Sequence, residues 1–388
     1  MTCEFFFDGC IETNTYLCSL MTYEQINVNK SVRMTKTVII GTGHYLPEVC
    51  KTNEDFLQST FLDAKGEPYP NSNQTIIEKF FDITKIKERR YIRADQNNSD
   101  IALIAAQRAI EDANIDPESL DYIICATNFG EVVFGDPRSN FMPSIAVRVK
   151  NKLRLKNPKM VAYDMIFGCP GWVESVIQAE AFIKAGLAKR ILVIGAETLS
   201  RVIDKYDRDS MIFADGAGAV VVEAKETDNH TGLLSHNSLS YTYDEAHFLY
   251  NGPTFNAAIK SNDIYIKMNG RKIYTFAVKH VPGAIKQTIE DAGLDITDIS
   301  KVLIHQANEK MDEAIIQRLY RLYDQPVPPG AMPMTIGKFG NSSVATIPTM
   351  LDLILKNQLG DHKIKKGDNV VMASVGAGMH INAIVYRF

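Results

Sequence analysis

A stretch that occurs twice indicates the fold of this chain. IAAQRAIEDANIDPESLDYIICA (Ile104–Ala126) aligns without gaps with GAIKQTIEDAGLDITDISKVLIH (Gly283–His305). The tetrapeptide IEDA is identical in both copies, and apolar positions coincide along the rest of each copy. Each copy is typical of a helix followed by a turn and a strand. The repeat therefore predicts a duplicated α/β unit.

A second, weaker pair supports the duplication. The helix pattern after Cys169 leads into AKRILVIGAE, and the helix pattern at Ile347–Gln358 leads into KGDNVVMASVGAG. No Pro-, Gly- or Ser-rich linker separates the two halves, so we expect them to share an interface. We predict an N-terminal half over residues 34–225 and a C-terminal half over residues 226–388, packed about a pseudo-twofold axis.

Short apolar runs alternate with amphipathic stretches along both halves. Continuous apolar runs between helices are typical of strands buried on both faces, and they predict the α/β class. The expected strands are Thr37–Ile40, Tyr122–Ala126, Arg190–Gly195, Ala217–Glu223, Lys301–His305 and Asn369–Ser374. The expected helices are Ser99–Ala113, Trp172–Ala185, Val281–Ala292, Glu309–Tyr323 and Ile347–Gln358.

Composition is that of an ordinary soluble globular protein. The 388 residues are 45% hydrophobic and 23% charged, with a net charge of −4. This balance excludes bulk attraction to nucleic acid or an anionic membrane, and no apolar run approaches a bilayer span. Residues 1–33 differ in pattern from the rest of the chain, and MTKTVIIGTGHYLPE from Met34 resembles a natural start. We treat residues 1–33 as an N-terminal extension, consistent with a start codon assigned too far upstream.

The cysteines show neither metal-ligand nor disulfide spacing. They form no CxxC pair and no regular pattern with histidines, so we expect no metal site and a reducing, cytoplasmic location. The six are Cys3, Cys10, Cys18, Cys50, Cys125 and Cys169.

Cys169 has an unusual local context. It lies in FGCPGW, between an apolar run and a helix pattern. A free cysteine is most often a buried packing residue, and Cys125 in YIICA is interpreted in that way. Pro170, however, suits the first position of a helix and would place Cys169 at the N-cap. Because a helix N-terminus lowers the pKa of a thiol, Cys169 is a candidate nucleophile.

Two further polar residues follow a strand or a glycine turn. His305 in LIHQAN stands where the first copy of the repeat has Ala126, and Asn341 follows the glycine of FGNSS. Each residue alone is more often structural. Together, a neutral histidine and an asparagine can both donate hydrogen bonds to one developing enolate oxygen. With a cysteine that holds an acyl group as a thioester, the set favours condensation over hydrolysis.

These motifs resemble those of the β-ketoacyl-acyl-carrier-protein synthase III family, within the thiolase-like superfamily. The likeness covers nearly all of Met34–Phe388. TKIKERRY (Thr84–Tyr91) is similar to that family's TGIRERR, and FADGAGAVVVE (Phe213–Glu223) to its FGDGAGAVVL. HQAN and GNSS are similar to its HQAN and GNTS signatures.

The resemblance implies a fold, an assembly and a site. The fold would be thiolase-like, with two duplicated halves in five layers, α-β-α-β-α, and the protein would be a homodimer. The catalytic triad would be Cys169, His305 and Asn341. The oxyanion loop would fall in SVGAG, at Gly376 and Gly378, with the N–H of Cys169 as the other donor.

The resemblance also implies a decarboxylative Claisen condensation. Cys169 would take an acyl group from acyl-CoA or an acyl carrier protein, and a malonyl thioester would then lose CO₂. The resulting carbanion would attack acyl-Cys169 and release a 3-oxoacyl thioester. The family needs no metal or cofactor for this reaction, since the CoA thioester is a substrate.

Several positions depart from the family pattern. EKFFDITKIKERR lacks the tryptophan and arginine that usually precede GIRERR, GCPGW replaces ACSGF, and GAG replaces GGG near the C-terminus. The segment Asn128–Met160 is longer than the family norm. These departures favour a specialised over a housekeeping member. They leave open the acyl chain length and whether CoA or a carrier protein is the donor.

Four further residues are candidates through the resemblance. Glu131 could be the base of relatives that join two acyl chains head to head, although a solvated loop carboxylate is the simpler interpretation. Lys310 matches a family position used for carrier docking, and Arg90 and Asn308 are further candidates for binding CoA or carrier. A basic run could also meet an acidic carrier or CoA phosphates, or form an ordinary solvated face: Lys150, Lys152, Arg154, Lys156 and Lys159.

The alternatives are head-to-head condensation, simple acyl transfer, and a non-catalytic thiolase-fold partner subunit. The intact Cys/His/Asn set argues against the non-catalytic subunit. A thiolase proper would need a second cysteine in the C-terminal half, and no cysteine follows Cys169.

Overall fold

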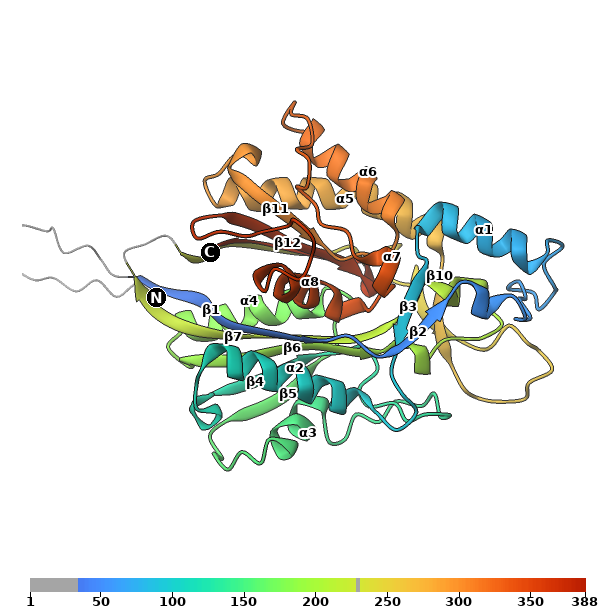
Figure 1. Cartoon of the computed structure of the whole chain (residues 1–388), viewed down its shortest axis with the longest axis horizontal. Helices are drawn as coiled ribbons and strands as arrows, with labels where there is room; N and C mark the ends of the chain where they lie inside the picture. The colour runs from blue at the N-terminus through green and yellow to red at the C-terminus, as the bar shows by residue number, and fades with distance from the viewer. Residues whose placement is uncertain (1–33, 228–230) are drawn as a thin grey trace, which may run out of the picture.

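Figure 1 shows the computed structural model of the chain, which describes residues 34–227 and 231–388. The predicted N-terminal extension, residues 1–33, lies outside the described residues. Cys50, Cys125 and Cys169 are free thiols.

Five strands form the sheet of the N-terminal half. Their order is β1 (Met34–Tyr45), β7 (Asp215–Thr227), β6 (Arg190–Thr198), β4 (Tyr122–Ala126) and β5 (Val161–Met165). β4 runs parallel to both β5 and β6, whereas β7 is antiparallel to both β6 and β1.

Four strands form the sheet of the C-terminal half. Their order is β11 (Ile299–Ile304), β12 (Asn369–Gly376), β13 (His380–Arg387) and β8 (Gly232–Ser240). β11 and β12 are parallel, and β13 is antiparallel to both β12 and β8. The series β11-β12-β13-β8 thus matches β4-β6-β7-β1 in order and in direction. This correspondence confirms the duplication that the repeat predicted.

Helices cover both faces of both sheets and give five layers (Figure 1). α2 (Asn98–Ala113) and α3 (Ile145–Lys152) pack on the outer face of the first sheet. α4 (Gly171–Lys184) and α8 (Thr346–Leu355) lie between the sheets, and α5 (Gly270–Asp291) and α6 (Glu309–Arg321) cover the outer face of the second. The expected α-β-α-β-α arrangement is confirmed.

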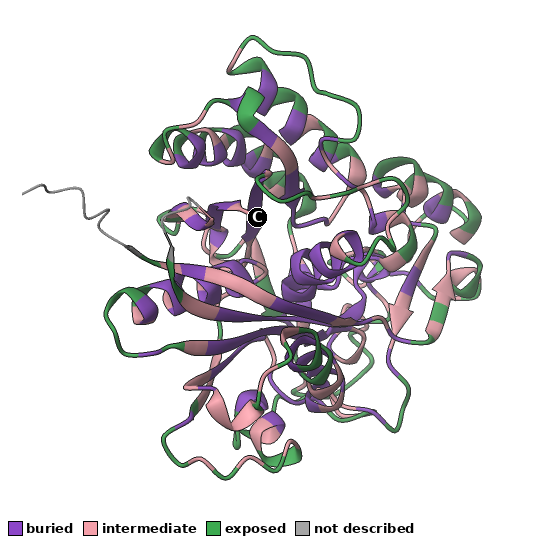
Figure 2. Ribbon diagram, turned by 60° about the vertical axis from the view of Figure 1, so that its left-hand side comes forward, coloured by how far each residue is buried: buried purple, intermediate pink, exposed green. Residues whose placement is uncertain are grey.

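Alternate residues of each strand point into different layers. In β4, Ile124 and Ala126 pack in the central layer, whereas Ile123 and Cys125 pack on the side of α2. All four are fully buried, and Figure 2 shows that buried residues concentrate in the centre of the molecule. Because both faces are covered, the central strand β4 is an almost continuous apolar run. Cys125 is a core residue, as predicted.

Most predicted elements lie within a few residues of their observed bounds. β4 coincides with its prediction, and α2 begins one residue earlier than expected, at Asn98. The largest difference is α5, which begins at Gly270 instead of Val281 and contains Pro282 in its interior. A proline usually stands in the first turn of a helix, so the sequence pattern placed the start too late.

The sequence patterns missed several elements. They are the hairpin of β2 (Val49–Thr52) and β3 (Glu88–Tyr91), the pair β9 (Leu249–Gly252) and β10 (Tyr265–Met268), and the helices α1 (Asn73–Thr84) and α7 (Ile336–Phe339). Of these, α1, β2, β3 and β10 lie toward one end of the molecule (Figure 1). α1 ends at Lys85, whose φ of 60° is left-handed. The family motif TGIRERR has glycine at this position, where the conformation costs least.

β7, in the first sheet, ends at Thr227, and β8, in the second sheet, begins at Gly232. The predicted boundary at residues 225/226 therefore falls in the last residues of β7, which still pair with β1 as far as Thr227. Within the described ranges, no helix is both long and apolar enough to cross a membrane.

Candidate active site

Cys169 lies in the tight loop between β5 and α4. The loop closes where the N–H of Gly171 donates to the carbonyl of Gly168, at 2.9 Å. Pro170 is the N-cap, so Cys169 precedes the N-cap instead of occupying it as expected. The physical reason is that the Pro170 carbonyl is already an acceptor of the first helical turn, from the N–H of Glu174.

His305 follows the last residue of β11. Its N–H donates to the carbonyl of Ala373 at 2.9 Å, which extends the pairing with β12 by one residue. The side chain is only 2% exposed. Its Nδ1 atom is buried and forms no hydrogen bond with the described residues. Nε2 is therefore the ring nitrogen left to face the cavity.

Asn341 is held by its backbone next to the start of β7. Its N–H donates to Ile212 and its carbonyl accepts from Ala214, at 2.9 and 2.8 Å. The side-chain Oδ1 accepts from the N–H of Ser343 at 2.8 Å. Because Oδ1 is occupied, the amide orientation leaves Nδ2 as the group free to donate.

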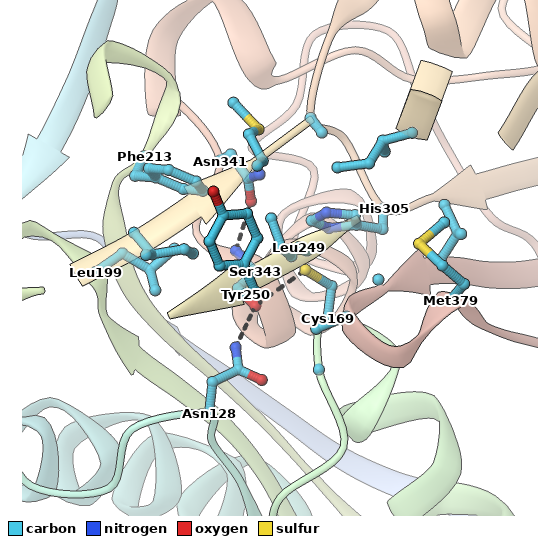
Figure 3. A pocket seen from close by; sticks show the side chains of 18 of the residues that line it. Asn128, Cys169, Leu199, Phe213, Leu249, Tyr250, His305, Asn341, Ser343 and Met379 are labelled. Atoms are coloured by element: carbon cyan, nitrogen blue, oxygen red, sulfur yellow. Dashed lines mark hydrogen bonds between the residues drawn. The ribbon is translucent and has the colours of Figure 1, made fainter. Parts of the chain in front are cut away.

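Cys169, His305 and Asn341 line one cavity of about 250 Å³ (Figure 3). The structure thus brings together the three residues that the sequence assigned to the triad. Most of the wall is apolar and suits an acyl chain. Its apolar side chains include Ile166, Leu199, Phe213, Leu249, Ile266 and Met268.

The pKa of Cys169 differs from the sequence expectation. Burial raises the pKa of this thiol to about 11, although Ser343 Oγ donates a hydrogen bond to the sulfur at 3.3 Å, which opposes the rise. The expected lowering of this pKa was therefore wrong, because burial, together with the nearby charge of Glu197, outweighs the hydrogen bonds that favour the thiolate. The thiol is mostly protonated at neutral pH in the resting protein.

Burial acts on His305 in the opposite sense. It lowers the pKa of the imidazole to about 4, and the nearby backbone of Ser343 opposes this only in part. His305 is therefore neutral across the physiological pH range. A neutral imidazole has one N–H to donate.

The expected oxyanion loop approaches Cys169 through one of its two glycines. Gly376, at the end of β12, packs so closely that a Cβ there would lie 2.6 Å from the nitrogen of Cys169. Gly378 has a left-handed φ of 76°, and a Cβ there would lie 2.4 Å from the His380 ring. Gly376 lines the cavity and Gly378 does not, so Gly378 shapes the loop.

Comparison with known proteins assigns the family. Family models described as 3-oxoacyl-[acyl-carrier-protein (ACP)] synthase III and its C-terminal part match residues 163–240 and 289–388. The β-ketoacyl-[acyl-carrier-protein] synthase III of Clostridium acetobutylicum is 33% identical over 362 residues, 92% of this chain and 99% of that protein. The chain belongs to the 3-oxoacyl-[acyl-carrier-protein] synthase III family.

Solved structures of synthase III proteins share the fold. The 3-oxoacyl-[acyl-carrier-protein] synthase III of Aquifex aeolicus VF5 matches with a TM-score of 0.75 and 32% identity, over 92% of this chain and all of that one. A structure of OleA from Xanthomonas campestris matches with a TM-score of 0.73 over 91% of this chain and 98% of its own. Its identity of 18% shows a common fold alone.

Glu131 does not lie in the synthase III cavity. Its carboxylate is buried, and it accepts hydrogen bonds from the N–H and the hydroxyl of Ser99 at 2.8 and 2.7 Å. Ser99 is in the first turn of α2, where N–H groups lack helical partners. Glu131 is neither a solvated loop carboxylate nor among the cavity-lining residues of this chain, because both oxygens serve this helix end.

The three carrier or CoA candidates lie outside the cavity lining. Lys310 is exposed on the first turn of α6. Asn308 is the N-cap of α6, and its side chain accepts from the N–H of Met311. Arg90, in β3, forms an ion pair with Glu88. Of the three, only Lys310 carries an exposed charge that forms no ion pair with another described residue.

The basic run is only partly a free surface. Lys150 donates to the carbonyls of Asn157 and Met160, and Lys152 donates to Ser99 and Asp100. These two lysines tie α3 to its surroundings. Arg154, Lys156 and Lys159 remain exposed.

Sequence reasoning assigned no role to two polar residues of the cavity, Asn128 and Ser343. Asn128 donates to Ser343 Oγ at 2.9 Å, and Ser343 Oγ donates to the sulfur of Cys169 (Figure 3). The internal repeat contained a signal for Asn128. It occupies the position of Ala307 in the second copy, and both residues line the cavity.

Within residues 34–227 and 231–388, no group of three or more His, Cys, Asp or Glu side chains is placed to hold a metal ion.

Proposed function

We propose that the protein is a condensing acyltransferase of the 3-oxoacyl-acyl-carrier-protein synthase III type. Cys169 takes an acyl group from a thioester, and a malonyl thioester then loses CO₂ and is acylated to a 3-oxoacyl thioester. The observation that carries the proposal is the shared cavity of Cys169, His305 and Asn341. The full-length likeness to synthase III proteins supports it.

The first half-reaction is acyl transfer to Cys169. The thiol loses its proton, and the sulfur attacks the carbonyl carbon of the acyl thioester. A new C–S bond forms and the old one breaks, which releases CoA or the carrier as a thiol with the proton. The N–H of Cys169 and the Gly376 loop would stabilise the oxyanion formed during this step, and the close approach of Gly376 to the nitrogen of Cys169 supports this role.

The second half-reaction uses His305 and Asn341. When the malonyl thioester loses CO₂, the electron pair of the broken C–C bond moves into an enolate. His305 and Asn341 both line the cavity, and His305 Nε2–H and Asn341 Nδ2–H would donate to the enolate oxygen. The enolate carbon then attacks acyl-Cys169, a C–C bond forms, and the cysteine sulfur leaves.

Lys310 supports a carrier-docking role for the exposed face of α6. Lys85 and Lys87 lie close enough to neighbouring Glu309 to act on its charge. The positive charges of Lys310, Lys85 and Lys87 would attract an acidic carrier protein. Lys310→Glu should lower turnover with a carrier-bound malonyl substrate and leave turnover with a CoA-bound substrate unchanged. Equal turnover of wild type and variant with the carrier would remove this role.

Exposed apolar side chains support a homodimer. Val133 and Phe134 are 52% and 64% exposed, and Met142 is 86% exposed, all within the long segment Asn128–Met160. Such side chains are typical of a surface covered by another protein, and we propose a second copy of this chain. Sedimentation of the whole protein at micromolar concentration should show a dimer.

The free thiols support a reducing, cytoplasmic location.

The head-to-head alternative loses its candidate base, because both carboxylate oxygens of Glu131 accept hydrogen bonds from Ser99 in α2. The decisive experiment is the mass of the intact protein after incubation with acyl-CoAs from acetyl to long-chain, with Cys169→Ser as control. We expect an acyl-sized gain that the control lacks, followed by 3-oxoacyl product on addition of a malonyl thioester. No gain with any acyl-CoA or acyl-carrier thioester would overturn the proposal and favour a non-catalytic subunit.

A further inference from the structure

Ser343 is the residue that contacts the nucleophilic sulfur through a side-chain hydrogen bond. Its hydroxyl donates to Cys169 Sγ at 3.3 Å, within the range for a bond to sulfur. Ser343 is 2% exposed, so water does not compete freely for this hydroxyl. In the described part of the chain, no other side chain donates to this sulfur.

Asn128 fixes the direction of the Ser343 hydroxyl. A serine hydroxyl has one hydrogen to donate and can also accept. Because Asn128 Nδ2 donates to Ser343 Oγ at 2.9 Å, the oxygen acts as acceptor on that side and its own hydrogen is left for the sulfur. Asn128 therefore acts on the sulfur through Ser343.

The backbone of Asn128 is itself held by a buried carboxyl group. Its backbone N–H donates to Glu197 Oε2 at 2.6 Å, and the hydroxyl of Thr127 donates to Glu197 Oε1 at 3.2 Å. Glu197 is fully buried in β6. A continuous series of contacts thus runs from the first sheet to the nucleophile.

The backbone of Ser343 is strained. Its φ of 53° is left-handed, a conformation that non-glycine residues rarely adopt. The same residue donates its N–H to Asn341 Oδ1 and thereby orients the amide that faces the cavity. One strained serine therefore orients both the sulfur and an enolate donor.

We propose that Ser343 and Asn128 form a hydrogen-bond relay that directs and stabilises the sulfur of Cys169 for attack. Ser343 touches the reacting atom, and Asn128 is a positioning residue that works through Ser343. The relay stabilises the negatively charged form of the sulfur, which burial disfavours. This stabilisation weakens once the acyl group is attached, because the sulfur of a thioester carries no charge. The assignment rests on the proposed function of Cys169 as nucleophile.

The test is the rate at which iodoacetamide alkylates Cys169 in the whole protein, followed by peptide mass at several pH values. Ser343→Ala should slow the reaction about tenfold at neutral pH and move its pH midpoint upward, as expected for the loss of a hydrogen bond to a charged group. Asn128→Ala should slow it about threefold, as expected for a weaker, indirect effect. In the Ser343→Ala background, Asn128→Ala should have no further effect.

Two controls separate the relay from general disruption. Ser342→Ala removes the neighbouring hydroxyl, which contacts Thr346 instead, and should alkylate like wild type. Ser343→Gly removes the hydroxyl but relieves the strained backbone, and should be as slow as Ser343→Ala. If Ser343→Ala does not fold, Ser343→Gly and Asn128→Ala provide the same comparison.

Unchanged alkylation in the Ser343 variants, or a full Asn128→Ala effect in the double variant, would overturn the relay. The outcome is independent of acyl chemistry, because iodoacetamide needs no acyl pocket. A Cys169 that shows these effects but accepts no acyl group would overturn the proposed function and leave the relay intact.

Discussion

Cys169, the proposed nucleophile, lies in an environment that disfavours its charged form. Burial holds the pKa of its thiol at about 11, so the charged form is rare at neutral pH. We expect the alkylation rate of wild-type Cys169 to rise about tenfold for each pH unit between about pH 7 and pH 10, as the fraction of thiolate grows.

Peptide mass spectrometry after timed iodoacetamide treatment measures this rate, and the exposed Cys50 in the same digest provides an internal comparison. A plateau already at about pH 8 would mean that the helix N-terminus prevails over burial.

His305 and Asn341 should be separable from Cys169 by half-reaction. His305→Ala or Asn341→Ala removes one donor to the enolate, which should lower CO₂ release from a malonyl thioester about 100- to 1000-fold. Acyl loading should fall much less, because the sulfur and the Gly376 loop are intact. The measurements are the intact mass for loading and evolved CO₂ for decarboxylation.

Cys169→Ser is the complementary control, since it should lose acyl loading while the two enolate donors remain. If all three variants lost both half-reactions to the same extent, the assigned division of roles would be incorrect.

At the scale of elements, Glu131 stabilises the first turn of α2. Glu131→Ala would leave the N–H and hydroxyl of buried Ser99 without their acceptor, and should lower the free energy of unfolding by about 1 to 3 kcal/mol. Acyl loading and condensation per folded molecule should stay at wild-type levels. Urea unfolding and product formation measure the two effects.

Glu111→Ala, an exposed carboxylate in the same helix, is the matched control and should leave stability nearly unchanged. Lost condensation with unchanged stability would instead restore Glu131 as a base.

The elements that the sequence located best are those buried on both faces. β4 was predicted to the residue because Tyr122–Ala126 is a continuous apolar run between turn signals. The predicted helix began too late because a proline such as Pro282 is typical of the first turn of a helix. In the structure Pro282 lies inside α5. β9 and β10 were missed because they form a short two-stranded pair of four residues each. Their apolar side chains Leu249, Ile266 and Met268 line the cavity.

At the scale of the whole molecule, buried carboxyl groups make stability depend on pH. Burial raises the pKa of Glu197 to about 8, well above the ordinary value of 4.5. The folded state then holds a proton that the unfolded state has lost. The contribution of Glu197 to stability is therefore full below about pH 4.5 and is lost as the pH rises through about 8.

For wild type, this group should lower the free energy of unfolding by about 2 to 3 kcal/mol between about pH 6 and pH 8.5. Glu197→Gln imitates the protonated acid and should flatten the dependence over this window, as measured by urea unfolding at several pH values. The same slope in wild type and variant would show that Glu197 does not hold its proton in the folded state.

The sequence by itself determined the duplicated α/β fold and pointed to the three residues of the proposed triad. Periodicity, strand ends and motifs are local properties, so a single chain displays them without its partners in space. Only the tertiary structure decided the ionisation of Cys169 and His305 and the role of Glu131, because desolvation depends on what surrounds a side chain. It also decided the Asn128–Ser343–Cys169 contacts. Asn128 and Ser343 are 215 residues apart and Ser343 and Cys169 are 174 apart, and only the packing of the two halves brings them together.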